Sequence, residues 1–410
     1  MPSASSSRWP RVVDQAPLLA ISRSHLDVLS TDLGIMQHAI GSVPDPKHGY
    51  CTDDVARALQ VDLLHRRTLG WPAVAASAWR NLRFLDTSFD TRTGRFRNFR
   101  TMSGHWIYAA PSEDSQGRAM LALGETIAAN PDRPMVSADR SISNVATALW
   151  DRALARAGTI TALRAQASML LGCIARLSAG ADAETSALLD LLAHNLQRGF
   201  DANTTSDWPW PEPILTYENG LLPRALIAAG QHIGDRAMVD TGLLALDWLM
   251  SVQTATAGHL APIGNEWWPR GGVRSRYDQQ PIEATALLLA AETALAATAD
   301  PRYRTVMELA YAWFLGANDR GVWVADPVRG SGSDGLTPEG LNANEGAEST
   351  LMWLMAAEHI RAMRHATELA ETAATAALAA ASPTAPPTDG PAPVLLPTDA
   401  NRQPAATAAR

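Results

Sequence analysis

The segment TDDVARALQVDLL (residues 52–64) places polar and acidic residues in one helical turn and then small and apolar residues on nearly every side. A helix that is apolar all round is one that the rest of the protein buries. The same pattern recurs in EDSQGRAMLALGE (113–125), ALRAQASMLLGCI (162–174), YENGLLPRALIAAG (217–230), QPIEATALLLAAE (280–292) and AESTLMWLMAAEH (347–359). We therefore expect six buried helices that begin in related ways.

The segments between these six are also helical in their apolar spacing, but they carry more Arg, Asp and Trp, as an outer layer would. The predicted helices span residues 22–40, 53–69, 72–88, 114–130, 138–156, 159–178, 183–199, 219–233, 235–251, 281–298, 301–316 and 344–368. Six inner helices alternating with six outer ones predict an all-α fold, the (α/α)6 toroid.

The toroid is expected to occupy residues 22–370 as one catalytic domain. Residues 1–21 are expected to be loosely ordered. Residues 371–410 are rich in Ala, Pro and Thr and have few large apolar side chains. Because such a segment buries too little surface to offset its ordering entropy, we expect a disordered tail.

The chain has 410 residues, 46% hydrophobic and 19% charged, which is typical of a soluble globular protein. Its net charge of −8 argues against a nucleic acid or an anionic membrane as partner, because both require concentrated basic surface. The N-terminus has no basic stretch followed by an apolar run, and no run of about 18 apolar residues occurs. We therefore expect no signal peptide, no membrane span and a cytoplasmic location.

Two cysteines, Cys51 and Cys173, are too few for a disulfide framework. A zinc site built on them would need His or carboxylate ligands as well. Cys173 lies well inside a buried segment, where a thiol is an ordinary small hydrophobe. We therefore expect neither a metal nor another cofactor.

Long loops precede five of the six buried helices, and they concentrate Gly, Pro, Trp and acidic residues. They span residues 41–52, 89–113, 201–217, 252–280 and 317–343. Long loops inside a compact domain are more often functional than idle. The sequence therefore predicts a pocket formed by these loops and the N-termini of the inner helices.

The stretch PDPKHGYCTDD (44–54) ends in two consecutive carboxylates, Asp53 and Asp54. Capping and the helix dipole favour acidic residues at a helix start, which explains one of them without a function. His48, Tyr50 and Arg57 are close by, and Tyr and Arg side chains bind sugar hydroxyls. Both interpretations of the pair stay open.

A second acidic pair, Glu113 and Asp114, begins the next buried helix, with Trp106 in the preceding loop. One acidic helix start is explained by capping. Two matching starts that face the same axis favour a role in function for at least one of Glu113 and Asp114.

The stretch DWPWPEPILTYENG (207–220) fixes Trp208 and Trp210 among prolines, with Glu212 and Tyr217 following. The two rings either form a platform on which a sugar stacks, beside a carboxylate, or they pack as a plug on the rim of the toroid.

Two further loops bring carboxylates and amides to helix starts. Glu266, Trp267 and Trp268 lie in a Gly- and Pro-bounded loop, and Gln280 and Glu283 follow at the next helix start. The last inner helix is preceded by NANEGAEST (342–350), which contains Asn344 and Glu345.

These groups predict a ring of carboxylates with Trp, Tyr, Asn, Gln and Arg around a concave mouth. Sugars require this mixture, because their C–H faces stack on indole rings while carboxylates and amides bind their hydroxyls. Cleavage of a glycoside needs one protonated carboxyl group as acid and a second carboxylate that acts on water or on the anomeric carbon. An oligosaccharide or polysaccharide is thus the expected substrate.

The stretches STDLGIMQHA (30–39) and PDPKHGYCTDDVARAL (44–59) resemble a family of bacterial modules within the six-hairpin (α/α)6 glycosidase superfamily. Its usual pattern is D-x-G-I-x-Q-H, then P-D, then H-G-Y-C-T-D-D-N-A-R-A-L, and Val55 here replaces the Asn. Such modules occur alone or joined to glycosyltransferase domains, so the resemblance implies an association with a glycosyltransferase. The chain itself has no Gly-rich strand-to-helix turn, which argues against transfer from a nucleotide sugar.

The resemblance to this superfamily implies a glycoside hydrolase, inverting more often than retaining. Our hypothesis makes Asp54 or Asp114 the general acid and Glu283 or Glu212 the group that activates water. Trp208, Trp210, Trp267 and Trp268 would line subsites.

Two alternatives stay open. A sugar epimerase or isomerase of the same fold would use His side chains to move a proton, and His48, His105 and His259 lie in loops of the expected mouth. The third possibility is a toroid that binds carbohydrate without catalysis.

Overall fold

The computed structural model describes residues 15–107, 112–131 and 141–381. The chain divides into two units, Met1–Met363 and Arg364–Arg410. The ring of helices described below belongs to the first unit, which contains the last inner helix up to Met363.

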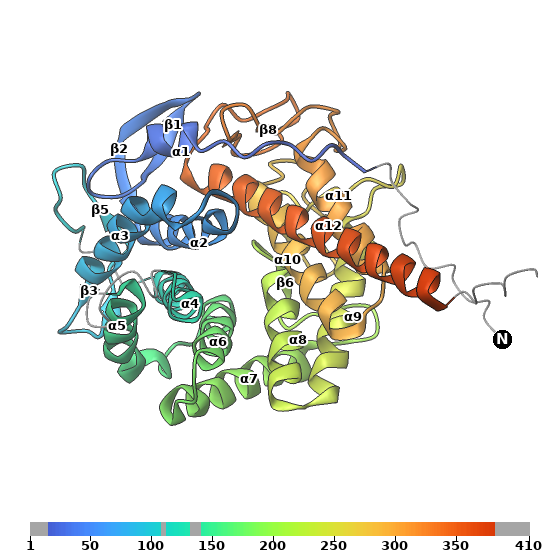
Figure 1. The fold of residues 1–410 in the computed structure, drawn as a ribbon, viewed down its shortest axis with the longest axis horizontal. Helices are drawn as coiled ribbons and strands as arrows, with labels where there is room; N and C mark the ends of the chain where they lie inside the picture. Colours follow the sequence, from blue (N-terminus) through green and yellow to red (C-terminus); the bar gives the residue numbers. More distant parts are fainter. Residues whose placement is uncertain (1–14, 108–111, 132–140, 382–410) are drawn as a thin grey trace, which may run out of the picture. The chain divides into compact units, whose positions relative to one another are not determined.

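The six inner helices are found where the repeated apolar pattern predicts them, and Figure 1 shows them around a common centre. They are α2 (Thr52–Leu69), α4 (Glu113–Ala129), α6 (Leu163–Ser178), α8 (Leu221–Ile233), α10 (Pro281–Thr298) and α12 (Ala347–Ala381). Helix α4 packs between α2 and α6, and α8 packs between α6 and α10. Polar contacts close the ring, because Thr285 of α10 donates to the Met352 carbonyl of α12 and Arg57 of α2 pairs with Glu348 of α12.

The outer layer consists mainly of five helices, each following an inner one along the chain. They are α3 (Trp71–Ser88), α5 (Ile142–Ala157), α7 (Ala183–Asn203), α9 (Arg236–Gln253) and α11 (Arg302–Phe314). This alternation confirms the (α/α)6 toroid.

The predicted helix over residues 22–40 is wrong for most of its length. Only α1 (Ser24–Leu29) is helical, and β1 (Met36–Ile40) pairs antiparallel with β2 (Val43–Cys51). Ile40 lies opposite Val43, so Gly41 and Ser42 form a two-residue hairpin turn, with Gly41 at φ +58°. Two-residue hairpin turns require this left-handed backbone, which glycine adopts without strain.

The other strands are short and lie in the loops. Strand β5 (Phe99–Arg100) extends the β1–β2 hairpin. Six further strands of two residues each form three antiparallel pairs: β3 (Phe89–Asp90) with β4 (Arg95–Phe96), β6 (Ile214–Leu215) with β7 (Trp268–Pro269), and β8 (Ala325–Asp326) with β9 (Ser331–Gly332). The β6–β7 pair joins the loop before α8 to the loop before α10.

The first eleven residues of the predicted disordered tail, 371–381, are helical instead, because α12 continues to Ala381. Residues 371–381 read ETAATAALAAA, and alanine has the highest helix propensity. Extending a helix that already exists also needs no new nucleation. The rest of the tail, and residues 1–14 of the predicted loose N-terminus, lie outside the described residues.

Helix α10 is long and apolar enough to cross a membrane by length and composition alone, and 67% of it is buried inside the fold. It packs against α8 and α11. Its apolar surface therefore forms part of the core of the ring.

Candidate active site

The N-termini of α2 and α12 are joined by a buried arginine. The Arg57 Nη1 donates to Asp54 Oδ1 at 3.1 Å, and its Nη2 lies 2.9 Å from Glu348 Oε2. Burial raises the pKa of Asp54 to about 7, with Arg57 opposing the rise and Glu348 adding to it. Asp54 thus has a carboxyl group that is largely protonated below neutral pH and held in place by Arg57.

The neighbouring carboxyl group, Asp53, is also perturbed. Its Oδ1 is buried with no hydrogen-bond partner among the described residues. Burial raises the pKa of Asp53, while Arg118 and Arg57 oppose the rise. An unpartnered buried oxygen is costly in a folded protein, and it is a candidate contact for a ligand hydroxyl.

Arg118 of α4 and Glu218, in the loop before α8, form a two-armed ion pair. Arg118 Nη1 lies 3.2 Å from Glu218 Oε1, and Nη2 donates to Oε2. Burial favours the neutral form of Glu218, but Arg118 and then Arg57 outweigh it and lower the pKa of this carboxyl below its ordinary value. Glu218 also has a left-handed backbone, with φ +48°. Such strain in a non-glycine residue clusters at functional sites.

Arg164, in the first turn of α6, organises the loop before α8. It donates from Nη1 to Glu212 Oε2 at 2.7 Å and from Nη2 to Asn219 Oδ1 at 3.3 Å. Its guanidinium carbon lies 4.8 Å from the centre of the Tyr217 ring. The Tyr217 hydroxyl donates in turn to Asp114 Oδ2.

Glu283, in the first turn of α10, is almost completely buried. Its Oε2 accepts hydrogen bonds from Asn219 Nδ2 at 2.9 Å and from the Asn219 backbone N–H at 3.3 Å. Its Oε1 is buried without a partner among the described residues. Burial raises the pKa of Glu283 to about 7, opposed by the bonds from Asn219 and by the charge of Arg164.

We call these carboxyl groups the carboxylate ring: Asp53, Asp54, Asp114, Glu218, Glu283 and Glu348. They come from α2, α4, α10 and α12 and from the loop before α8, and Arg57, Arg118 and Arg164 interact with members of this set. Two members have a pKa near neutrality, and one has its pKa lowered by an ion pair. Carboxyl groups whose environments push their pKa values apart are typical of acid–base sites.

Sequence reasoning did not select several residues that connect this ring: Arg118, Arg164, Glu218, Asn219 and Glu348. All five lie at or near the start of an inner helix. That shared position is the signal that could have identified them.

The tryptophans of the loop before α8 are packed rather than open. Trp208 and Trp210 are 4% and 0% exposed, and their ring centres lie 5.0 and 6.1 Å from that of Trp248. Trp268 stacks on the same ring at 6.2 Å, whereas Trp267 is 42% exposed. The structure therefore matches the rim plug for Trp208 and Trp210.

Around α2, three predicted site residues have other contacts. Tyr50 is buried, and its hydroxyl lies 2.8 Å from Thr31 Oγ1. The exposed His48 packs edge-on against His38 at 4.6 Å. Trp106 packs against the ring of Phe84 at 5.2 Å.

The carboxylate of Glu113 caps the next inner helix rather than its own. It accepts hydrogen bonds from the backbone N–H groups of Thr161 at 2.9 Å and Ala162 at 2.6 Å, just before α6. This contact explains an acidic residue at position 113 without a ligand, whereas Asp114 beside it belongs to the carboxylate ring.

Near the start of α12, Asn344 and Glu345 connect chain segments. Asn344 Oδ1 accepts from the Ala39 N–H at 2.8 Å, and Glu345 pairs with Arg329 at 3.0 Å. Gln280 is the half-buried N-cap residue of α10, and Glu266 is exposed.

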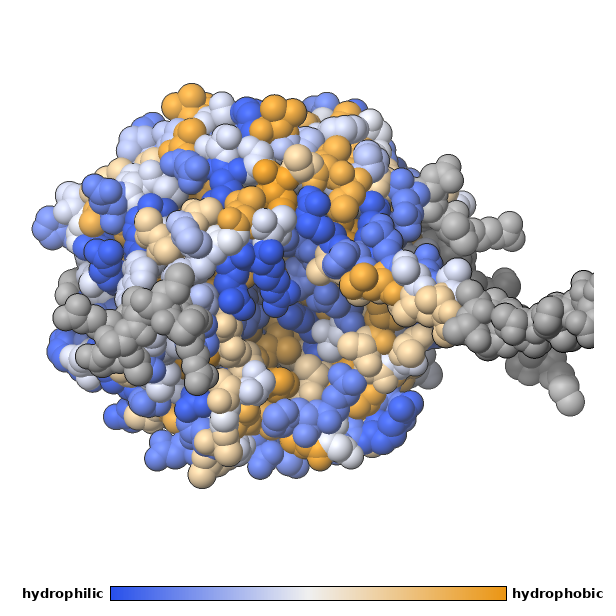
Figure 2. Space-filling view, in the orientation of Figure 1, coloured by the Kyte–Doolittle hydropathy of each residue, from blue (hydrophilic) through white to orange (hydrophobic). Residues whose placement is uncertain are grey.

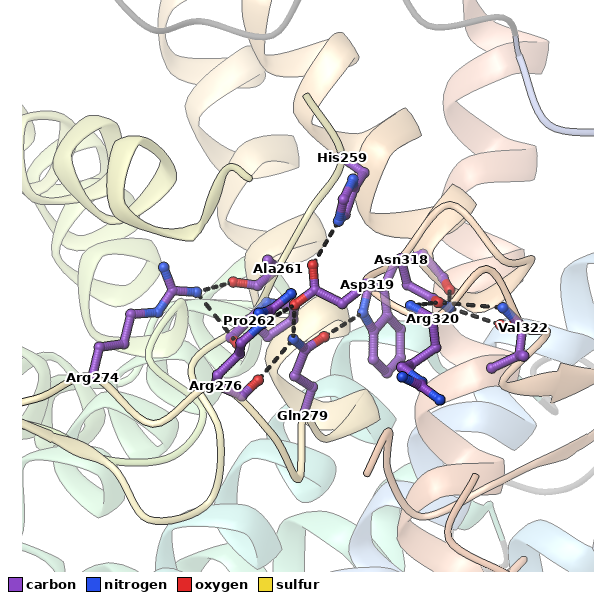
Figure 3. A network of polar contacts seen from close by, with 11 residues as sticks. His259, Ala261, Pro262, Arg274, Arg276, Gln279, Asn318, Asp319, Arg320 and Val322 are labelled. Atoms are coloured by element: carbon purple, nitrogen blue, oxygen red, sulfur yellow. Dashed lines mark hydrogen bonds and ion pairs between the residues drawn. The ribbon is translucent and has the colours of Figure 1, made fainter. Parts of the chain in front are cut away.

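The loops before α10 and α12 are joined through Asp319, as Figure 3 shows. Asp319 Oδ1 lies 2.8 Å from His259 Nε2, and Oδ2 accepts from Arg276 and from Gln279 Nε2 at 3.0 Å. Gln279 Oε1 accepts in turn from Trp313 Nε1 at 3.1 Å. His259 is therefore held in one orientation beside a carboxylate.

Within residues 15–107, 112–131 and 141–381, no group of three or more His, Cys, Asp or Glu side chains is arranged to hold a metal ion. Cys51 and Cys173 are both buried free thiols.

No protein-family model matches this sequence. No curated protein matches it either. Solved structures with the same fold include a D-mannose isomerase (TM-score 0.62, 11% identity, covering 83% of this chain and 96% of the other). A cellobiose 2-epimerase from Spirochaeta thermophila has a TM-score of 0.59 and 14% identity over 80% of this chain and 89% of the other. An inactive α-1,6-mannanase variant from a Salegentibacter species, in complex with α-1,6-mannotriose, has a TM-score of 0.52 and 13% identity over 82% and 96%. These TM-scores establish a shared fold.

Proposed function

We propose that this protein cleaves a glycosidic bond in an oligosaccharide or polysaccharide, with Asp54 as general acid and Glu283 as the group that activates water. The observation that carries this proposal is the presence of two buried carboxyl groups, at two inner-helix N-termini of one ring, whose pKa values are both about 7.

Asp54 suits the acid step. A general acid is most effective when its pKa lies near the working pH, so that it is protonated but gives up its proton readily. Asp54 would donate its proton to the oxygen of the departing sugar. The Arg57 guanidinium, 3.1 Å away, would then stabilise the carboxylate that remains.

Glu283 suits the second role. Asn219 holds one carboxylate oxygen, and the other oxygen has no partner among the described residues. In its ionised form Glu283 would accept a proton from water as that water attacks the anomeric carbon. The proton gained by Glu283 and the proton lost by Asp54 balance the hydrolysis.

The comparisons support a carbohydrate substrate. The structurally similar mannanase was solved with a bound trisaccharide, as an inactive variant with two consecutive aspartates replaced by asparagine. Asp53 and Asp54 are also consecutive, at the start of α2. A neutral hexose oligosaccharide is thus the first substrate class to test.

The test is release of reducing sugar from a panel of manno- and gluco-oligosaccharides, α-1,6-mannotriose included. We expect wild-type turnover on at least one member and a loss of about 10²- to 10⁴-fold in Asp54→Asn. The exposed pair of Asp240 with Arg236 offers a control, and Asp240→Asn should retain full activity. Equal turnover by Asp54→Asn and wild type would show that Asp54 is not the acid.

Structural similarity to an isomerase and an epimerase makes sugar epimerisation the competing chemistry. The same samples should be run in deuterated water. Incorporation of deuterium into an intact sugar, with no cleavage product, would show that the protein is an epimerase and not a hydrolase. Binding without any conversion would instead indicate a carbohydrate-binding protein.

A further inference from the structure

A cavity of about 330 Å³ opens between the inner helices, away from their N-termini. Gln60 of α2 and Leu289 of α10 line it, and each lies six residues beyond a carboxyl group of the carboxylate ring, Asp54 and Glu283. At a rise of 1.5 Å per residue this places the cavity roughly 9 Å deeper along those helices. Figure 2 shows that one face of the ring is hollowed near its centre.

Three arginines line this cavity. Arg66 and Arg67 come from the last turn of α2, and Arg224 comes from the first turn of α8. Within the part of the chain that the structure describes, none of the three guanidinium groups forms a hydrogen bond or an ion pair, and the Nε atoms of Arg66 and Arg224 are buried without a partner. This is a concentration of cations in a chain whose net charge is −8.

The arginines also have acidic neighbours. Glu125 accepts a hydrogen bond from Gln60 at 2.9 Å, and Glu292 lies 2.8 Å from His359 Nδ1. The charges of Arg224 and Arg67 also help to lower the pKa of Glu292, so this carboxylate offsets part of the positive charge. Burial and the neighbouring Arg67 lower the pKa of Arg66, which indicates that Arg66 and Arg67 repel each other.

The helix dipole explains only part of this arrangement. A cation at a helix C-terminus is favourable, so Arg66 and Arg67 suit the end of α2. Arg224 lies near the N-terminus of α8, where the dipole disfavours a cation. The dipole therefore does not account for the position of Arg224, which the charge of Glu292 favours instead.

We propose that this cavity binds a phosphate group, either free or as the phosphate ester of a small molecule. The planar guanidinium fork matches phosphate oxygens in pairs, and three such groups supply the charge that a dianion requires. A volume of about 330 Å³ lies at the small end of ligand pockets and suits a ligand of monosaccharide size. The proposal does not depend on hydrolysis at the carboxylate ring.

The test is calorimetric titration of the full-length protein with inorganic phosphate, glucose 6-phosphate and glucose. We expect the two phosphates to bind and glucose to give no signal in this cavity. The triple variant Arg66→Gln, Arg67→Gln, Arg224→Gln should bind phosphate at least about tenfold more weakly. Arg156, an exposed arginine in the last turn of α5, provides the control, and Arg156→Gln should bind as wild type does.

The two phosphates distinguish the source of the ligand. If glucose 6-phosphate binds more tightly than inorganic phosphate, the ligand is a phosphate ester. If it binds equally or more weakly, the ligand is free phosphate. Unchanged phosphate binding by the triple variant, or no phosphate binding by wild type, overturns the proposal.

A structural role for the arginines predicts a different result in the absence of ligand. If they only stabilise the fold, the triple variant melts at a lower temperature and its phosphate binding matches that of wild type. If they form a phosphate site, the ligand-free variant melts at the same or a higher temperature, because the repulsion between Arg66 and Arg67 is removed.

Discussion

At the scale of single residues, Glu283 is a site residue whose burial makes the folded protein less stable. In the unfolded chain this carboxyl group titrates near its ordinary pKa of 4.5, whereas burial raises its pKa to about 7 in the folded protein. Between these values the folded state binds more protons than the unfolded state. The free energy of unfolding therefore falls as the pH rises through this window.

Replacing Glu283 by Gln should remove this penalty. The amide has the shape of the protonated carboxyl group and carries no charge at any pH. We expect Glu283→Gln to be more stable than wild type by about 3 kcal/mol at pH 8, and by much less at pH 4.5. Thermal or urea unfolding at both pH values measures the difference.

The exposed loop residue Glu339 provides a matched control, because Glu339→Gln removes a carboxylate that is already in water. Its effect on stability should be small and the same at both pH values. A Glu283→Gln variant that is equally destabilised at pH 4.5 and pH 8 would show that Glu283 is not a strained buried acid.

The residue scale also shows what local sequence cannot reveal. Asp53 and Asp54 stand out in the sequence because they are adjacent at a helix start. Their partners do not, since Arg57 pairs with Glu348 and Arg118 pairs with Glu218 far along the chain. For the tryptophans the same limit applies, because the burial of Trp208 depends on Trp248 of a later helix.

At the scale of elements, α4 and α6 are in backbone contact. A Cβ atom added to Gly124 would lie 2.2 Å from the Gly172 carbonyl oxygen, and one added to Gly172 would lie 2.7 Å from the Met120 carbonyl oxygen. Only glycine permits this approach. The contact fixes the distance between two inner helices and hence the positions of Asp114 and Arg164 at their N-termini.

Gly124→Ala should therefore destabilise the protein by about 1–3 kcal/mol, as overpacking does. This sign is opposite to that of helix propensity, which favours Ala over Gly. Gly199 of α7 offers the comparison, because a Cβ there meets only side-chain atoms, the two Leu163 methyl groups at 3.3 and 3.5 Å and Pro211 Cβ at 3.6 Å. Differential scanning calorimetry of both variants tests this, and a higher melting temperature for Gly124→Ala would contradict the close packing.

The inner helices were predictable because a helix that is apolar all round has few alternatives. The β1–β2 hairpin was not, since the apolar residues between 22 and 40 also fit a helical period. The decisive feature is the glycine turn at Gly41, which lies just beyond the predicted helix. The Ala-rich end of α12 shows the reverse case, in which composition suggested disorder but propensity extended a helix.

At the scale of the whole ring, the repeated sequence pattern predicts the fold, but it does not predict which of the carboxyl groups act in catalysis. Every inner helix begins near the same mouth, so a sequence pattern brings many carboxylates together without ranking them. Burial and charge separate them in the structure: Asp54 and Glu283 are buried with raised pKa values, and Glu218 is held ionised by Arg118.

The central claim is that a glycosidic bond lies between Asp54 and Glu283 when it is cleaved. The most direct measurement is a crystal structure of Asp54→Asn with the oligosaccharide that wild type cleaves. We expect the glycosidic oxygen about 2.6–3.2 Å from the side chain at position 54, with the anomeric carbon facing Glu283. A sugar bound away from both side chains, for example in the cavity lined by Arg66 and Arg224, would contradict the account.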